Sequence, residues 1–199
     1  MGSIRTFIAV DIAPVVKAVA KKQIRVLERF VSGYRWVDPA TMHLTLKFLG
    51  NVPDVEIPQL CRLVEGAVAN HPIFDIGIRG VGAFPSADRA RVLWLGVDDY
   101  DGEFTSLQKD IDDVLRKEMG FQPEARDFKG HLTLGRSIEQ PRFSRALADH
   151  LAENADVEFG GMEVDQVIIY SSFQDKGGPT YTAMDTIDLP GDLQKHSAE

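Results

Sequence analysis

The chain has 199 residues, of which 44% are hydrophobic and 26% charged, and its formal net charge is −8. This balance is typical of a globular protein, and the acidity argues against a protein that coats long stretches of nucleic acid. The single cysteine, Cys61, excludes an internal disulfide and a zinc site built from several cysteines. No apolar run is long enough to span a bilayer and the N-terminus lacks the layout of a secretory signal, so we expect a cytoplasmic protein without a membrane partner.

The hydrophobic pattern predicts alternating strands and helices without a long linker. Strands are expected at 4–12, 42–49, 74–84, 91–97, 128–134, 164–173 and 180–189. Helices are expected at 14–31 and 54–69, then after an N-cap at Asp101, and at 141–152. Gly177-Gly178-Pro179 would join the last two strands. The short links and the scarcity of strand–helix–strand repeats favour an α+β fold rich in antiparallel sheet.

The tetrapeptide His-Leu-Thr-Leu occurs twice, at 43–46 and 131–134, each time in an expected strand. Because strand side chains alternate between faces, each copy would bury its leucines and present an imidazole beside a hydroxyl. In the first copy the same alternation places Lys47 beside the histidine and Phe48 beside the leucines. Two such strands facing each other across a cleft would offer two imidazoles and two hydroxyls.

Phosphoester cleavage by in-line displacement suits this set of side chains. The reaction needs a base at the attacking oxygen and an acid at the departing one, and a histidine with a pKa near ~6.5 can fill either role. Thr45 and Thr133 would stabilise the charge that develops on the phosphate oxygens. Lys47 and Arg136 would add positive charge.

Other kinds of site fit the repeated motif less well. A single His-x-Thr in a strand is usually structural, but two copies in equivalent strands favour a shared chemical site. A zinc site on the two histidines lacks a third ligand at a characteristic spacing. A Ser-His-Asp hydrolase lacks the G-x-S-x-G elbow.

The paired motifs resemble those of the 2H phosphoesterase superfamily. Within it, the chain is similar to the RNA 2′,3′-cyclic phosphodiesterases, also called 2′–5′ RNA ligases. The segments RTFIAVDI, RWVDPATMHLTLKFLGNV, RVLWLGV, FKGHLTLGR and SSFQDKGGPTY follow that family's order, so the resemblance covers most of the chain. The chain departs from the family at Gly130, where members often have proline, and a looser backbone is expected there.

The resemblance implies a bilobal α+β fold. Two similar lobes of mostly antiparallel sheet, with helices outside, would enclose the active-site groove between them. Residues 1–190 would form this single domain, with one HLTL copy in each lobe, and 191–199 a polar tail.

The resemblance also implies a reaction and a role for each motif residue. A terminal 2′,3′-cyclic phosphate would be hydrolysed to a 2′-phosphate without a metal or other cofactor, with His43 as general acid and His131 as general base. Thr45 and Thr133 would hold the phosphate, with Arg136 as a further contact. The partners would be RNA ends or small nucleotides that carry a cyclic phosphate, and reversible 2′–5′ joining of RNA ends is the same chemistry run backwards.

Two further candidate site residues depend on strand geometry. In a straight strand Arg136 would fall on the leucine side, so its contact with phosphate requires a twist or bulge, expected at Gly135. In the first strand, Phe7 lies on the face opposite Ile8 and Val10. It would either stack on a terminal base or pack within a sheet covered on both sides.

Three functions therefore remain open. The first is a phosphodiesterase acting on RNA ends, and the second is a related enzyme acting on small cyclic nucleotides or oligoadenylates. The third is a non-catalytic RNA-end binder, which would not need an acid–base pair. The acidic composition is compatible with a monomer, which we expect.

Overall fold

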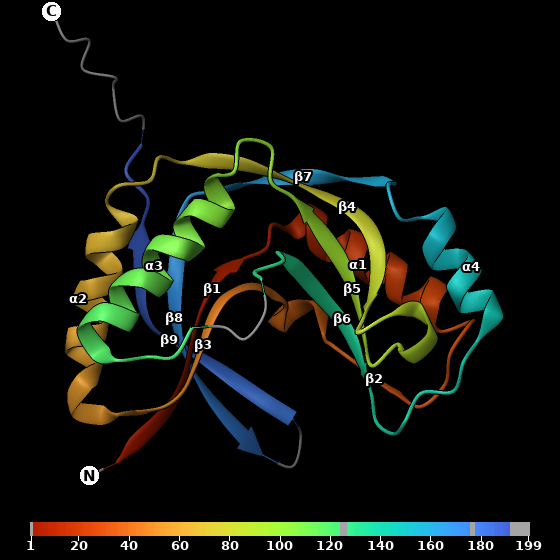
Figure 1. The fold of residues 1–199 in the computed structure, drawn as a ribbon, viewed down its shortest axis with the longest axis horizontal. Coiled ribbons are helices and arrows are strands. Elements are labelled where there is room, and N and C mark those ends of the chain that lie inside the picture. The colour runs from red at the N-terminus through yellow and green to blue at the C-terminus, as the bar shows by residue number, and fades with distance from the viewer. Residues whose placement is uncertain (1, 124–126, 176–177, 192–199) are drawn as a thin grey trace, which may run out of the picture.

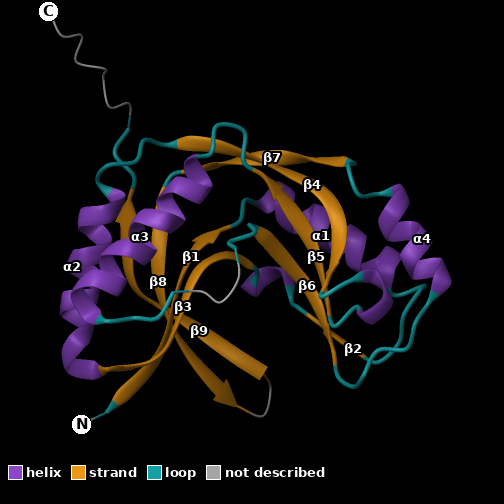
Figure 2. Ribbon diagram, in the orientation of Figure 1, coloured by secondary structure: helices purple, strands orange, loops and turns teal. Residues whose placement is uncertain are grey.

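The computed structural model of the protein describes residues 2–123, 127–175 and 178–191. It is an α+β fold in which two antiparallel sheets carry helices on their outer faces (Figure 2). The strands are β1 (Ser3–Asp11), β2 (Tyr34–Trp36), β3 (His43–Pro53), β4 (Phe74–Phe84), β5 (Val92–Asp98), β6 (His131–Ser137), β7 (Glu158–Val164), β8 (Gln166–Asp175) and β9 (Gly178–Asp188). The helices are α1 (Pro14–Leu27), α2 (Ile57–Val68), α3 (Glu103–Met119) and α4 (Arg145–Glu153).

The two lobes are not two consecutive halves of the chain. One sheet has the strand order β3-β1-β8-β9, and the other has the order β2-β6-β5-β4-β7. Each sheet therefore combines strands from the beginning and the end of the chain. The HLTL segment at 43–46 lies in the first sheet and that at 131–134 in the second, and β3 and β6 lie side by side near the middle of the molecule (Figure 1).

The helices on each sheet, like the strands, do not come from one consecutive half of the chain. α2 and α3 pack against each other over the first sheet, where α2 contacts β9 and α3 contacts β3. α1 packs on β6 and β7, and α4 packs on β4, on the second sheet (Figure 1). The buried aliphatic side chains of both lobes form one continuous core. None of the helices within the described ranges is long and apolar enough to cross a membrane.

Two strands were missed in the sequence. β2 has only three residues, and β7 contains Gly160 and Gly161, so neither gives a clear alternation of apolar and polar side chains. Both are edge strands of the second sheet. The first helix is also shorter than expected, because α1 ends at Leu27. The predicted tail, apart from Gly191, lies outside the described residues, as does Gly177 in the last hairpin.

The expected N-cap of α3 at Asp101 is wrong. The Asp99 carboxylate instead accepts hydrogen bonds from the backbone N–H groups of Phe104 and Thr105, at 3.0 and 2.9 Å. Gly102 has a positive φ of 78°, a conformation that glycine adopts at little cost, and this turns the chain so that Asp99 reaches the free amides.

Candidate active site

The two motif histidines are held in the same way. His43 Nδ1 lies 3.1 Å from the carbonyl oxygen of Thr41, and His131 Nδ1 lies 2.8 Å from that of Lys129. Since a carbonyl can only accept a hydrogen bond, Nδ1 carries the proton in both rings. Nε2 is then the nitrogen of each neutral ring that can take up a proton.

Both motif strands contain an extra residue at the same place. In the pairing of β1 with β3, the register shifts so that Leu46 has no partner. In the pairing of β5 with β6, Leu134 is skipped in the same way. The bulge that Arg136 requires is therefore present, one residue before the predicted Gly135. It places Arg136 on the same face as the motif histidine and threonine of its strand.

The bulge in β3 reverses the predicted positions of Lys47 and Phe48. Lys47 is only 2% exposed, and its ammonium forms an ion pair with Asp112 of α3 and donates to the carbonyl of Gln122 at 3.2 Å. Phe48 is 57% exposed and lies on the face of His43. The expectation that Lys47 adds charge to the site is wrong, because the bulge turns this side chain toward α3.

The charge of Arg136 acts on both histidines. Burial is the main reason that the pKa values of His43 and His131 lie below the ordinary range, and the Arg136 guanidinium lowers both further. The same guanidinium also acts on Tyr181 of β9, a strand of the first sheet. One cation from β6 thus faces groups from both lobes, which places the two motif strands around a common charge.

The charged groups near the two histidines differ. Asp11 is paired with His43 across the β1–β3 ladder, and its carboxylate raises the pKa of His43. The Tyr170 hydroxyl donates to Asp11 Oδ1 at 2.7 Å and holds this carboxylate in place. At His131 the neighbouring charges are the Arg136 guanidinium and the Lys129 ammonium, and both lower the pKa. The Asp11 carboxylate therefore favours protonated His43 against the opposing charge of Arg136, whereas both cations near His131 favour its neutral form.

Phe7 packs beneath His43. Its ring centroid lies 4.6 Å from that of His43, 5.1 Å from Tyr170 and 5.0 Å from Tyr181. The side chain is 2% exposed. Of the two roles that the sequence left open, the structure favours packing, because the neighbouring rings cover Phe7.

Aromatic rings also frame His131. The ring of Phe84 meets the imidazole edge-on at 5.0 Å, and that of Trp94 lies 6.4 Å away. Lys129 Nζ lies 4.5 Å above the Trp94 ring. The two histidines thus sit in separate apolar surroundings, which explains why burial dominates both pKa shifts.

The motif threonines lie beside the histidines. Thr45 and Thr133 are half-buried, and within the described part of the chain neither hydroxyl forms a hydrogen bond. Both hydroxyls are thus available to a ligand. Among the described residues, no group of three or more His, Cys, Asp or Glu side chains is arranged to hold a metal ion.

The backbone before His131 is tightly packed. A Cβ atom at Gly130 would lie 2.9 Å from the Phe104 ring and 3.0 Å from Val97. The carbonyl of Gly130 accepts a hydrogen bond from the Val97 N–H at 3.1 Å. The looser backbone expected from the absence of proline is therefore not found.

A comparison with protein families decides the classification. The family model described as the 2′-5′ RNA ligase superfamily matches residues 15–175. The chain belongs to the 2′-5′ RNA ligase superfamily.

Curated relatives of this superfamily align over nearly the whole chain. A protein of Methanothermobacter thermautotrophicus is 35% identical over 94% of this chain and 99% of its own length. One of Thermotoga maritima is 35% identical over 97% of this chain and 100% of its own. Both relatives are named RNA 2′,3′-cyclic phosphodiesterase.

Solved structures share the fold. A crystal structure from Thermus thermophilus matches with a TM-score of 0.80 and 26% identity, over 95% of this chain and 100% of that one. E. coli LigT complexed with 3′-AMP matches with a TM-score of 0.70 and 20% identity, over 94% and 98% of the two chains. The predicted bilobal α+β architecture is confirmed.

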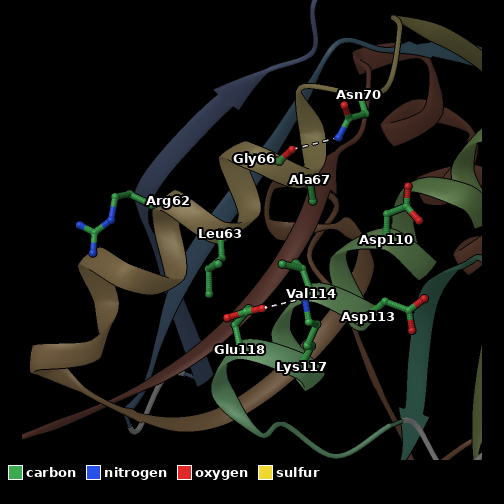
Figure 3. Close-up of a pocket in the computed structure, with 10 residues that line it drawn as sticks. All are labelled: Arg62, Leu63, Gly66, Ala67, Asn70, Asp110, Asp113, Val114, Lys117 and Glu118. Carbon is green, nitrogen blue, oxygen red and sulfur yellow. Dashed lines mark hydrogen bonds and ion pairs between the residues drawn. The ribbon is translucent and has the colours of Figure 1, made fainter.

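A surface depression of this superfamily member lies away from the motif strands. It runs between α2 and α3, and Arg62, Asp110, Lys117 and Glu118 are among the side chains that line it (Figure 3). The two helices present charged side chains together with apolar ones such as Leu63 and Val114 there, and Lys117 pairs with the neighbouring Glu118 at 3.2 Å. None of the predicted site residues contributes to this depression.

Several residues of the candidate active site were missed in the sequence. Asp11, Tyr170 and Tyr181 come from strands far apart in the chain, and Trp94 and Phe84 come from a hairpin of the other lobe. The only visible signal was Asp11, an acidic residue directly after the apolar run 7–10 at the end of β1.

Proposed function

We propose that this protein hydrolyses the terminal 2′,3′-cyclic phosphate of RNA to a 2′-phosphate, with His43 and His131 as acid and base. The observation that carries the proposal is the packing of β3 beside β6, which brings the HLTL segments of the two lobes together, with Arg136 on the histidine face of β6. Each histidine has its Nδ1 engaged by the backbone. The names of the relatives support the same reaction.

The charges near the histidines support the assignment of roles. A general acid must hold a proton until the leaving oxygen takes it, and the Asp11 carboxylate favours protonated His43. A general base must be neutral, and the Lys129 ammonium favours neutral His131. His43 would therefore protonate O3′ as the phosphorus–O3′ bond breaks, and His131 would take the proton from the attacking water.

Phosphate binding would rest on the remaining motif side chains. Thr45 and Thr133 have hydroxyls without a partner among the described residues, so they are free to donate to the non-bridging oxygens. The Arg136 guanidinium would offset the negative charge that develops there. The phosphate stays attached through O2′, which gives the 2′-phosphate product.

The base of the terminal nucleotide would contact Phe48 in place of the predicted Phe7. Phe48 is exposed on the same face as His43, and its ring centroid lies 5.9 Å from that of Phe7. Phe7 would act as the support beneath. Stacking on an aromatic ring accepts any base.

In this proposal the enzyme works as a monomer in the cytoplasm, as expected from the sequence. The same site would also catalyse the reverse reaction, in which a 5′-hydroxyl takes the place of water and RNA ends are joined in a 2′–5′ linkage. A binder without activity would not require two histidines with opposite neighbouring charges, and this difference favours catalysis.

The test is to incubate the protein with a short RNA that ends in a 2′,3′-cyclic phosphate, in excess EDTA. We expect conversion to a 2′-phosphate end. A 3′-phosphate product would show that the leaving oxygen is O2′ and that the scheme is wrong. Absence of turnover with tight binding of the RNA would identify a binder.

A further inference from the structure

We propose that Arg35 of β2 binds the phosphodiester that joins the terminal nucleotide to the preceding one. This second phosphate subsite would make the enzyme prefer an RNA chain over a cyclic mononucleotide. The inference rests on the proposed function, because it takes the cyclic phosphate to lie at Arg136.

Strand register places Arg35 beside Arg136. β2 and β6 are antiparallel, with Arg35 directly opposite Arg136 and Trp36 opposite Gly135. Residues directly opposite in such a ladder point to the same face. The Trp36 ring covers Gly135, where a Cβ would lie 2.5 Å from a ring carbon, and it packs on the core. The two arginines therefore share the opposite face, which is that of the motif histidine.

This arrangement is unfavourable unless an anion is present. Like charges directly opposite each other across a ladder destabilise it. Arg35 and Arg136 are both exposed, and within the described ranges neither forms an ion pair. In a chain with a net charge of −8, acidic partners are abundant, so two adjacent unpaired guanidinium groups indicate a site for anions from outside.

The placement suits two successive phosphates of one strand. Neighbouring strands lie about 4.8 Å apart, and long arginine side chains on two such strands can spread to contact two separate phosphates. With the cyclic phosphate at Arg136, the preceding phosphodiester would lie over Arg35. A 2′,3′-cyclic mononucleotide has a 5′-hydroxyl and no phosphate at this place.

The experiment compares 2′,3′-cyclic AMP with a short RNA ending in a 2′,3′-cyclic phosphate, for the wild type and Arg35→Gln. We expect the variant to raise KM for the RNA about tenfold, with kcat nearly unchanged and the mononucleotide unaffected. The slope of log(kcat/KM) against log salt for the RNA should become shallower by about 0.7, the value for one phosphate contact on a single strand. Arg35→Lys should restore most of the RNA affinity, because it keeps the charge.

Arg25→Gln is the matched control. Arg25 is an exposed arginine of α1, outside the groove, and its loss should leave both substrates unaffected. If Arg35→Gln lowers kcat/KM equally for both substrates, Arg35 only supports Arg136. If its kinetics on RNA are unchanged, the subsite does not exist. Either result would overturn the inference.

A binding measurement separates this inference from the proposed function. Fluorescence anisotropy with an RNA that ends in a 2′-phosphate needs no turnover. If the wild type hydrolyses neither substrate, the proposed function fails, yet Arg35→Gln should still weaken binding of this RNA about tenfold. Equal affinity for the wild type and the variant would refute the subsite independently.

Discussion

The two motif strands share the same main-chain geometry as far as the bulge. After the bulge they carry chemically different side chains. β3 and β6 each begin with a histidine held by a carbonyl two residues earlier, and each bulges at its second leucine. The next residue points inward in both strands: Lys47 pairs with Asp112, whereas Gly135 makes room for Trp36. The residue after it points to the groove, and it is Phe48 in one strand and Arg136 in the other.

This difference shows how a repeated strand produces an asymmetric site. The repetition supplies two imidazoles held in the same way, and the residues after the bulge give one side an apolar ring and the other a cation. The carboxylate of Asp11 and the ammonium of Lys129 add a second asymmetry. A nucleotide with its base toward β3 and its phosphates toward β6 fits this division.

Replacement of either motif histidine should have the same effect on turnover. We expect His43→Ala and His131→Ala each to lower kcat by about 10³-fold, because each loses a proton-transfer step. Thermal unfolding should change little, since each ring makes only one hydrogen bond among the described residues. Substantial activity in either variant would break the equivalence and refute the mechanism.

Arg136 tests the cationic side. Arg136→Ala should lower kcat/KM by about 10²-fold through lost stabilisation of the phosphate charge. Both limbs of the pH–rate profile should also move to higher pH, because the guanidinium lowers the pKa of both histidines. Movement of only one limb would show that Arg136 serves a single strand. The profile is measured with the cyclic mononucleotide.

Lys47 tests the inward position. Lys47→Met removes one partner of a buried ion pair and leaves the Asp112 carboxylate without its cation, so the free energy of unfolding should fall by about 3 kcal/mol. Urea denaturation measures this loss. Turnover per folded molecule should remain, and the double variant Lys47→Met/Asp112→Leu should recover part of the stability. Lost activity with unchanged stability would instead support a chemical role for Lys47.

Phe48 tests the apolar side. Phe48→Ala should raise KM for a cyclic nucleotide about tenfold, in line with the stacking of one base on an aromatic ring. Phe143→Ala is the control, because Phe143 is equally exposed at 57% but precedes α4. A substrate that carries a cyclic phosphate on an abasic ribose should not distinguish the wild type from Phe48→Ala. If it does, Phe48 acts on something other than the base.

The smallest effect should come from Asp11. Because its carboxylate raises the pKa of His43, Asp11→Asn should lower that pKa. The acid then loses its proton earlier, so the alkaline limb of the pH–rate profile should move to lower pH while the acid limb stays. Glu28→Gln, at an exposed residue next to α1, is the control. A shift of the acid limb would exchange the roles of the two histidines.

The sequence predicted what short-range rules control. The range 74–84 was predicted to the residue, and the HLTL repeat indicated two histidines with two threonines on one face of their strands. The need for a bulge before Arg136 also followed from strand alternation. The predicted faces of Lys47 and Phe48 were wrong because no residue in the first copy indicates the same bulge. This bulge is visible only in the pairing of β3 with β1.

By itself, the amino-acid sequence determined the fold class and the paired motif, because strand alternation and the identity of a tetrapeptide depend on neighbouring residues alone. The tertiary structure decided the rest. Only the packing of β3 beside β6 brings one arginine near both histidines, and only the ladders place Asp11 opposite His43 and Arg35 opposite Arg136. These contacts join residues up to about a hundred positions apart, and a charge acts through space and not along the chain.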